Sequence, residues 1–345
     1  MAKVVAFFNN KGGVGKTTTS CNVAAGLSQY LGKKVLYVDL DPQCNATLLI
    51  LGEDQVTECY WSHPDDHKSI INIINPLLVD EPGIKFDPEA VIKDGNRFGV
   101  DLIMGHPNLS EIEDRLGEAW VKVPGGDIGA LRKTNWCSDL VQNLSQDYDY
   151  IILDLGPSLG SLNRSALLAS DYFVTPMSID IFSIVGLRNI SRWLNDWIRK
   201  YDRGIANLDA TNPEYFDRYP VKKKVDILNG CLGYTSQAYH SRRNKDGDRR
   251  PTKAFESILN LFEQNFIQYL GAFSVTGLVA RDLMLGVIPN MFSLAALAQQ
   301  SSSPIRDLRA NDGIFGAHYS QAKTYSSIFD SIASQIVNNM GPKND

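Results

Sequence analysis

A short glycine-rich segment near the N-terminus carries the residue types that bind a phosphate chain. Residues 9–18 read Asn-Asn-Lys-Gly-Gly-Val-Gly-Lys-Thr-Thr, and they follow an apolar run, residues 3–8, that is typical of a strand. Glycines let backbone N–H groups point at an anion, and a following helix adds its positive N-terminal end. Lys16 would reach the β and γ phosphates, and the Thr17 hydroxyl would ligate Mg²⁺. The segment therefore predicts a nucleoside triphosphate site, with these residues around the phosphates: Lys11, Gly12, Gly13, Val14, Gly15, Lys16, Thr17 and Thr18.

Two residues of this segment depart from the usual phosphate-binding loop. The general pattern has a glycine five residues before Gly15, where this chain has Asn10, and the chain adds a second lysine, Lys11. Lys11 has a simpler interpretation as a solvated loop residue, but it stands where the charge of a phosphate chain must be neutralised. The loop predicts a nucleotide held by more positive charge than one subunit's own site needs.

A second buried strand, further along the chain, is expected to end in carboxylates. Gly32 is a natural end for the first helix, and the apolar run 35–39 that follows reads as a parallel strand covered on both faces. It ends at Asp39, and Asp41 stands two residues later. Carboxylates there can order a Mg²⁺-bound water or the water that attacks a γ-phosphate. Turn formation before Pro42 is the alternative role.

A third apolar strand, 150–154, ends in Asp154 and runs into a Gly-Pro loop, residues 155–160. This arrangement is typical of a second carboxylate on the metal side, followed by a loop that senses the γ-phosphate. Open α/β sheets bind their ligands at the carboxyl ends of the strands, where these segments would meet. We therefore expect a three-layer α/β fold, with a mostly parallel twisted sheet and helices on both faces.

The chain resembles the ParA/MinD family of P-loop ATPases, which have a deviant loop with an extra lysine. The stretches that carry the resemblance are Lys11–Thr19, Asp39–Thr47, Asp154–Gly160 with Asn163 and Ala166–Leu167, Val174–Pro176 with Ser183–Leu187, and Leu285–Pro289. The first stretch matches the family's loop residue for residue. The second is similar to its first switch, apart from Cys44 in place of a usual glycine, and the third resembles its second switch. The similarity spans nearly the whole chain and favours the ParA partition branch.

The resemblance implies a dimer that forms with ATP and Mg²⁺. ATP would lie between two subunits, and Lys11 of each would reach the phosphates held by the other, adding positive charge where negative charge develops. Asp41 would position the attacking water. The implied site residues are Lys11, Lys16 and Asp41 for catalysis, Thr17, Asp39 and Asp154 for the metal, and Pro289 at the start of the base-binding loop. The family further implies non-specific DNA binding by the ATP-bound homodimer and a partner protein that stimulates slow hydrolysis.

Two stretches differ from the family pattern. Gly156 replaces the first of two usual prolines in the second switch, which is expected to loosen that loop. After Pro289, residues 290–298 replace the arginine and the Ser-Glu-Ala-Pro-like stretch that the family often has. Contacts around the adenine and on the usual partner face are therefore expected to be rebuilt.

The composition is that of an ordinary soluble protein, with 345 residues, 43% of them hydrophobic, and a net charge of −5. We expect one domain, 1–345, with insertions at about 52–98 and 201–253. No apolar run approaches the length of a membrane span. Because an apolar strand begins almost at once, we expect no signal peptide before it. Five scattered cysteines without C-x-x-C spacing fit a reduced cytoplasm and argue against a zinc or iron–sulfur site.

The second insertion is basic on an acidic chain. Residues 222–253 hold nine basic and three acidic residues, an excess that suits contact with phosphate groups. DNA contact, contact with a partner protein and simple solvation all remain open. The residues expected to contact DNA or a partner are Lys222, Lys223, Lys224, Arg242, Arg243, Arg249 and Arg250. A second candidate face, on the helix after Gly186, comprises Arg188, Arg192, Arg199 and Lys200. Trp193 and Trp197 on that helix are expected to pack internally.

The C-terminal stretch, about 321–340, has apolar residues at helical spacing, and its polar side lacks the cations that interfacial helices need. We expect it to pack onto the core and not on a membrane.

The motifs and the resemblance together suggest two functions. One is a ParA-like ATPase for DNA partition or cargo positioning, cytoplasmic and associated with the nucleoid if it binds DNA. The other is a regulatory or assembly ATPase, the switch subunit of a protein-positioning or defence system, in which DNA binding is incidental.

Overall fold

An eight-stranded, mostly parallel sheet forms the centre of the computed structural model, which describes residues 1–64, 67–93, 95–237, 241–243, 249–251, 253–291 and 293–341. The strand order is β10-β7-β6-β1-β5-β2-β4-β3, and every neighbouring pair is parallel except β3 and β4. The strands are β1 (Lys3–Phe7), β2 (Val35–Leu40), β3 (Val91–Ile92), β4 (Asp101–Ile103), β5 (Tyr150–Leu155), β6 (Tyr172–Ser178), β7 (Cys231–Gln237) and β10 (Met284–Ile288). The predicted parallel sheet is confirmed.

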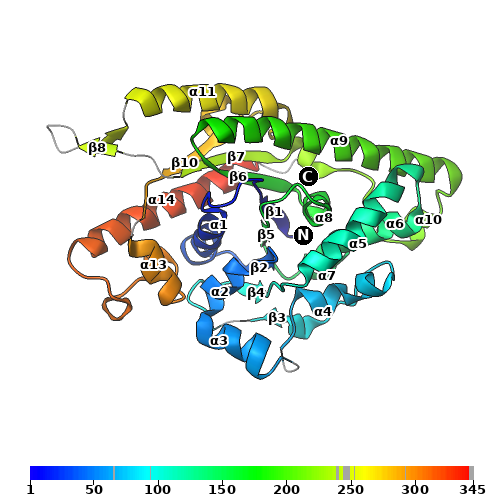
Figure 1. Cartoon of the computed structure of the whole chain (residues 1–345), viewed down its shortest axis with the longest axis horizontal. Helices are drawn as coiled ribbons and strands as arrows, with labels where there is room; N and C mark the ends of the chain where they lie inside the picture. Colours follow the sequence, from blue (N-terminus) through cyan, green and yellow to red (C-terminus); the bar gives the residue numbers. More distant parts are fainter. Residues whose placement is uncertain are drawn as a thin grey trace.

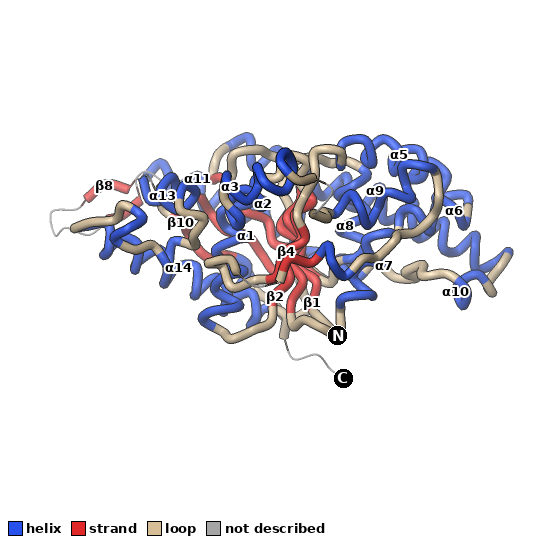
Figure 2. Tube along the Cα trace, turned by 90° about the horizontal axis from the view of Figure 1, so that it is seen from below, coloured by secondary structure: helices blue, strands red, loops and turns tan. Residues whose placement is uncertain are grey.

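Helices cover both faces of this sheet (Figures 1 and 2). The helices are α1 (Lys16–Ala25), α2 (Asn45–Leu51), α3 (Glu53–Thr57), α4 (Ile70–Ile74), α5 (Leu109–Lys122), α6 (Ile128–Thr134), α7 (Trp136–Leu144), α8 (Ser161–Ala169), α9 (Ile181–Thr211), α10 (Tyr215–Arg218), α11 (Lys253–Leu270), α12 (Ala280–Leu283), α13 (Ser293–Gln300) and α14 (Ala317–Asn339). Figure 2 shows α1, α13 and α14 on one side of the strands and α5, α7, α8 and α9 on the other.

The alternation of side chains along β1 explains the three layers. Val4 and Ala6 point into a core under α5, α7, α8, α9 and α11, whereas Val5 and Phe7 point into a second core under α1, α13 and α14. Successive residues of a strand face opposite sides, so a strand that is apolar throughout must be covered twice. β2 and β5 are buried at every residue for the same reason. The predicted three-layer α/β architecture is confirmed.

The segment 201–253, expected from sequence as an insertion, contains elements of the central fold, so those bounds are corrected. Its first residues continue α9 to Thr211, and β7 lies inside the sheet between β6 and β10. β7 carries Gly233 and polar residues between its apolar ones. The sequence therefore shows no continuous apolar run there, although the strand is largely buried. The tract that follows β7 includes a two-stranded antiparallel ribbon, β8 (Ser241–Arg243) and β9 (Arg249–Pro251).

The other expected segments have mixed outcomes. Residues 52–98 contain short helices, as expected, but also β3 at the sheet edge. The C-terminal helix α14 buries Tyr325, Phe329, Ile332 and Ile336 in the core. Trp197 is buried and Trp193 stacks on Phe8, with ring centroids 5.4 Å apart, so both pack internally as predicted. In the described ranges, no helix has the length and apolar character needed to cross a membrane.

Candidate nucleotide site

The glycine-rich segment forms the turn that joins β1 to α1. Gly13 and Gly15 have positive φ angles, 72° and 68°, so a side chain there would be strained. A Cβ atom on Gly15 would also lie 2.0 Å from Oε1 of Gln237. α1 begins at Lys16 directly after this turn, and its first backbone N–H groups have no partner within the helix. The turn therefore presents open donors and a helix N-terminus, the arrangement that binds phosphate.

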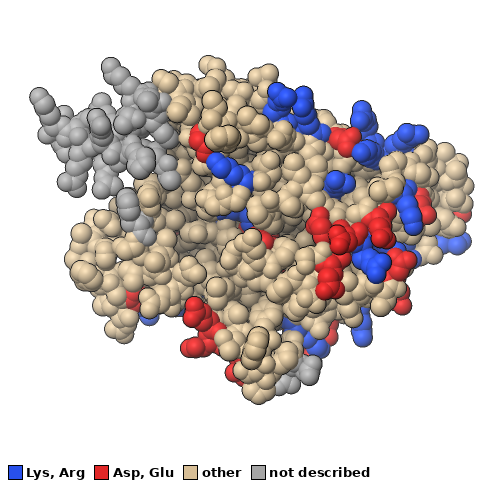
Figure 3. Space-filling model, in the orientation of Figure 1, with Lys and Arg blue, Asp and Glu red and all other residues tan. Residues whose placement is uncertain are grey.

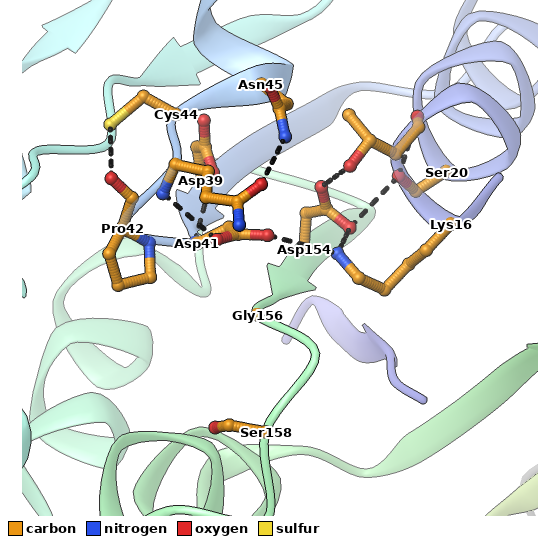
Figure 4. Close-up of polar contacts among 12 residues, drawn as sticks. Lys16, Ser20, Asp39, Asp41, Pro42, Cys44, Asn45, Asp154, Gly156 and Ser158 are labelled. Carbon is orange, nitrogen blue, oxygen red and sulfur yellow. Dashed lines mark hydrogen bonds and ion pairs between the residues drawn. The ribbon is translucent and has the colours of Figure 1, made fainter. Parts of the chain in front are cut away.

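Lys16 lies among carboxylates at the ends of two strands (Figure 4). Its Nζ atom is 2.9 Å from Oδ1 of Asp154 and 3.8 Å from Oδ2 of Asp41. Thr17 donates to the other oxygen of Asp154 at 2.8 Å. Burial alone would lower the pKa of Lys16, but the carboxylates around it, Asp154 first, hold its pKa above the ordinary value. Lys16 is therefore charged, as a ligand for phosphates must be.

Asp39 and Asp154 are direct neighbours in the register of β2 and β5. Burial and the nearby charge of Asp154 raise the pKa of Asp39 to about 7. Its Oδ2 atom accepts hydrogen bonds from the backbone N–H and hydroxyl of Thr47, at 2.8 and 2.7 Å, and its Oδ1 accepts from the N–H of Asp41. Asp39 thus anchors the segment between β2 and α2, and the contact with Thr47 was not anticipated from sequence.

The segment that Asp39 anchors carries Asp41 and a strained residue. Oδ1 of Asp41 accepts the N–H of Gln43 at 3.0 Å, which leaves its Oδ2 facing Lys16. Cys44, which stands where the family usually has glycine, adopts a left-handed conformation with φ 53° and ψ 30° directly before α2. Such a conformation costs a residue with a side chain about 1–2 kcal/mol, which explains why glycine is usual there.

The loop after Asp154 is tied down despite its glycine. Asn163 donates to the carbonyl oxygens of Gly156 and Ser158, both at 2.8 Å. The N-terminus of α8, which follows this loop, is capped by Glu113 of α5, whose carboxylate accepts the N–H groups of Ser161 and Leu162. The loosening expected from Gly156 is therefore opposed by contacts from two helices. The role of Glu113 has no local signal in the sequence, because 48 residues separate it from Ser161.

Lys11 lies at the edge of the site and has a partner in its own chain. Its Nζ atom is 2.5 Å from Oδ2 of Asp180 and 3.0 Å from the Ser178 hydroxyl. Asp180 is the N-cap of α9 and accepts the N–H of Ser183 through its other oxygen. Although partial burial opposes it, the hydrogen bonds from Lys11, Ser178 and Ser183 lower the pKa of Asp180 to about 2.

These elements surround a cavity of about 460 Å³. The complete predicted loop, 11–18, lines one side together with Asp41. α13 also lines the cavity, through Ala295, Ala298 and Gln299. The sequence had indicated the first two only as part of a departure from the family, residues 290–298, and Gln299 lies just beyond that stretch. Pro289, which follows β10, is not among the described residues that line this cavity, so its contact with a base stays a prediction. Gln237, which donates to Gly15 O and Thr19 Oγ1, was missed because β7 was missed.

The structure does not bring the basic candidates together. Lys222, Lys223 and Lys224 precede β7, and the ribbon β8–β9 follows it, so the seven residues of this strand lie between the two groups along the chain. Lys222 pairs with Asp226 at 2.8 Å, and Lys223 lies over the ring of Phe216. The side chains of Arg242, Arg243, Arg249 and Arg250 lie outside the described residues, although their backbone forms the ribbon. Contact of these seven residues with DNA or a partner therefore stays a prediction.

Comparisons with known proteins agree with the geometry. A family profile described as an AAA domain matches residues 2–206, more than half of the chain. The chain is 36% identical over 191 residues to the sporulation initiation inhibitor protein Soj of Bacillus subtilis, covering 55% of this chain and 64% of Soj, just under two thirds. It is 35% identical over 236 residues to a virulence plasmid ParA family protein of Chlamydia psittaci, covering 67% and 80% of the two chains. A crystal structure of a Corynebacterium diphtheriae protein superposes with a TM-score of 0.72 at 28% identity, covering 99% and 100%.

Proposed function

This chain belongs to the ParA/MinD family of ATPases, and we propose that it hydrolyses ATP slowly and forms a dimer around the bound nucleotide. The observation that carries this proposal is the cavity, which has the whole phosphate-binding loop on one side and Lys11 at its rim. Lys16 would bind the β and γ phosphates. Asp41, whose Oδ2 faces the same space, would orient the attacking water.

The residues near Lys16 also fit Mg²⁺. This ion usually keeps several waters and binds through one or two carboxylates together with substrate phosphates. Thr17 and Asp154 place a hydroxyl and a carboxylate 2.8 Å apart beside the loop, which is such a partial oxygen set. Asp39 would support Thr17 and Asp154 without contacting the ion itself, because its oxygens already accept hydrogen bonds from Thr47 and Asp41. When bound, the ion would neutralise phosphate charge, and Thr17 and Asp154 would hold it.

Lys11 would complete the site of a second subunit. We expect the wild-type chain to change from monomer to dimer when ATP and Mg²⁺ are added, and Lys11→Ala to bind ATP but remain monomeric. Size-exclusion chromatography with light scattering checks this, with Lys33→Ala, an exposed lysine after α1, as the control. A wild-type chain that stays monomeric with ATP would contradict the proposal.

The ribbon β8–β9 is the part of the basic tract that best suits DNA. Its register places Arg242 opposite Arg250 and Arg243 opposite Arg249. The backbone ribbon thus brings four arginine positions of the sequence into one short element, and basic residues suit contact with a phosphate backbone. We propose that the ATP-bound dimer binds DNA non-specifically through this ribbon.

Charge-reversal substitutions distinguish the contributions of the two basic groups to DNA binding. We expect Arg249→Glu/Arg250→Glu to weaken DNA binding at least tenfold and to make the slope of log affinity against log salt shallower by about 2. The matched control, Lys223→Glu/Lys224→Glu, should retain both properties, because those lysines lie at the other end of β7. Fluorescence anisotropy with ATP at several salt concentrations measures both. A larger loss in the control variant would assign DNA contact to the opposite end of the sheet.

One observation favours the second function, a regulatory or assembly ATPase. α5 exposes Glu111, Asp114 and Glu118 to solvent. Figure 3 shows this acidic surface beside the Lys and Arg side chains gathered along α9. Acidic side chains repel DNA, and they suit a basic surface of a protein partner. Within α9, Arg199 and Lys200 already pair with Asp196, which weakens that helix as a DNA surface.

A further inference from the structure

The first turn of α9 exposes three large apolar side chains together. Ile181, Phe182 and Val185 are 66%, 74% and 54% exposed. Their spacing places them on one side of the helix, while Ser183 and Leu187 on the other side are buried. The turn is well formed, because Asp180 caps it. Three adjacent exposed apolar residues are unusual on a protein surface and mark a place where something binds.

This turn adjoins the loop that carries Lys11. Lys11 is bonded to Asp180, the residue directly before the turn. Oδ1 of Asn10 would lie 3.2 Å from a Cβ atom on Gly186, so the loop also lies against the next turn of α9. The apolar side chains, Lys11 and the nucleotide cavity that Lys11 lines therefore form a continuous surface.

The position of Lys11 limits what can cover the apolar turn. A lysine reaches only as far as its four-carbon stem allows. If Lys11 is to contact phosphates held by another molecule, that molecule must approach the surface beside Asp180 closely. Its arrival would bury the neighbouring apolar side chains, which gives a hydrophobic contribution to the association.

We propose that Ile181, Phe182 and Val185 form a contact surface for a second copy of this chain in the ATP-bound state, and that Lys11 leaves Asp180 as this surface closes. The inference rests on the proposed nucleotide-gated dimer and adds the surface that stabilises it. A symmetric dimer uses the same patch twice, so one substitution removes two contacts. Asp180 would serve as the counter-ion that holds Lys11 while no second copy is present.

The test compares two phenylalanines of nearly equal exposure. Phe182→Ser should weaken ATP-dependent dimerisation roughly 100-fold, because each subunit loses a buried aromatic side chain. Phe315→Ser, at a residue that is 73% exposed and precedes α14, should dimerise like the wild type. Light scattering over a concentration series with a slowly hydrolysed ATP analogue gives the dimer dissociation constants. Binding of a fluorescent ATP analogue and thermal melting confirm that both variants are folded and take nucleotide.

The outcomes distinguish an incorrect contact surface from the absence of an ATP-dependent dimer. Loss of the dimer in Phe182→Ser alone, with nucleotide binding intact, supports the inference. A Phe182→Ser chain that dimerises like the wild type overturns it while the proposed function stands. A wild-type chain that binds the ATP analogue and stays monomeric overturns both, and it would assign the apolar turn to a different protein.

Discussion

Lys16→Met should abolish ATP binding and also destabilise the nucleotide-free chain by about 3–5 kcal/mol. Lys16 is almost fully buried, and its Nζ atom pairs at 2.9 Å with Asp154, whose side chain is fully buried. Removing one member of a buried ion pair leaves the other charge without compensation. Urea unfolding without nucleotide measures the loss of stability, and a fluorescent ATP analogue measures binding.

A second substitution tests the cause of that instability. Lys16→Met/Asp154→Asn should regain much of the lost stability, because the uncompensated charge is gone, but it should not regain ATP binding. Lys33→Met, at an exposed lysine, should change the free energy of unfolding by no more than about 0.5 kcal/mol. Equal losses in Lys16→Met and Lys33→Met would contradict the dependence of Asp154 on Lys16.

Asp41→Ala should lower the rate of ATP hydrolysis by a factor of about 10²–10⁴, the usual contribution of a group that orients or activates a water. ATP binding should change little, because the backbone and Lys16 provide the phosphate contacts. The ATP-bound dimer should consequently persist for longer. Phosphate release under single-turnover conditions measures the rate, and light scattering follows the dimer.

Asp41→Asn is the matched control for this substitution. It retains an oxygen that can accept the N–H of Gln43, which Asp41 does at 3.0 Å, but it removes the charge beside Lys16. If Asp41 acts on the water, Asn should be nearly as slow as Ala. An Asn variant with the wild-type rate would show that Asp41 only shapes the turn before α2.

Local patterns along the chain predicted that the glycine-rich loop and three carboxylates lie close together. The loop 11–18, Asp39, Asp41 and Asp154 each follow a strongly apolar strand, and parallel strands bring their carboxyl ends to one edge of the sheet. The approach of Lys16 to Asp154 follows from that rule and from the register of β1 beside β5. Few other contacts are needed to place these groups, so short motifs suffice.

The remaining features depend on contacts between distant segments. β7 was missed because Gly233 and its hydroxyl-bearing residues weaken the apolar pattern, although the strand is largely buried. That omission hid Gln237 and joined two basic groups that the strand separates. The wall formed by α13 has small apolar residues with no recognisable motif. The ion pair of Lys11 and Asp180 joins residues 169 positions apart, which no local pattern can indicate.

The carboxylate of Glu113 links the loop after Asp154 to a helix surface outside the cavity. Glu113 holds the first backbone N–H groups of α8, and Asn163 of the same helix holds the loop, so this loop, α8 and α5 form one mechanical unit. The exposed acidic side chains of α5 belong to this unit. A molecule that binds α5 and a nucleotide that contacts the loop would then shift the same conformational equilibrium. By thermodynamic reciprocity, each would change the affinity of the other by the same factor.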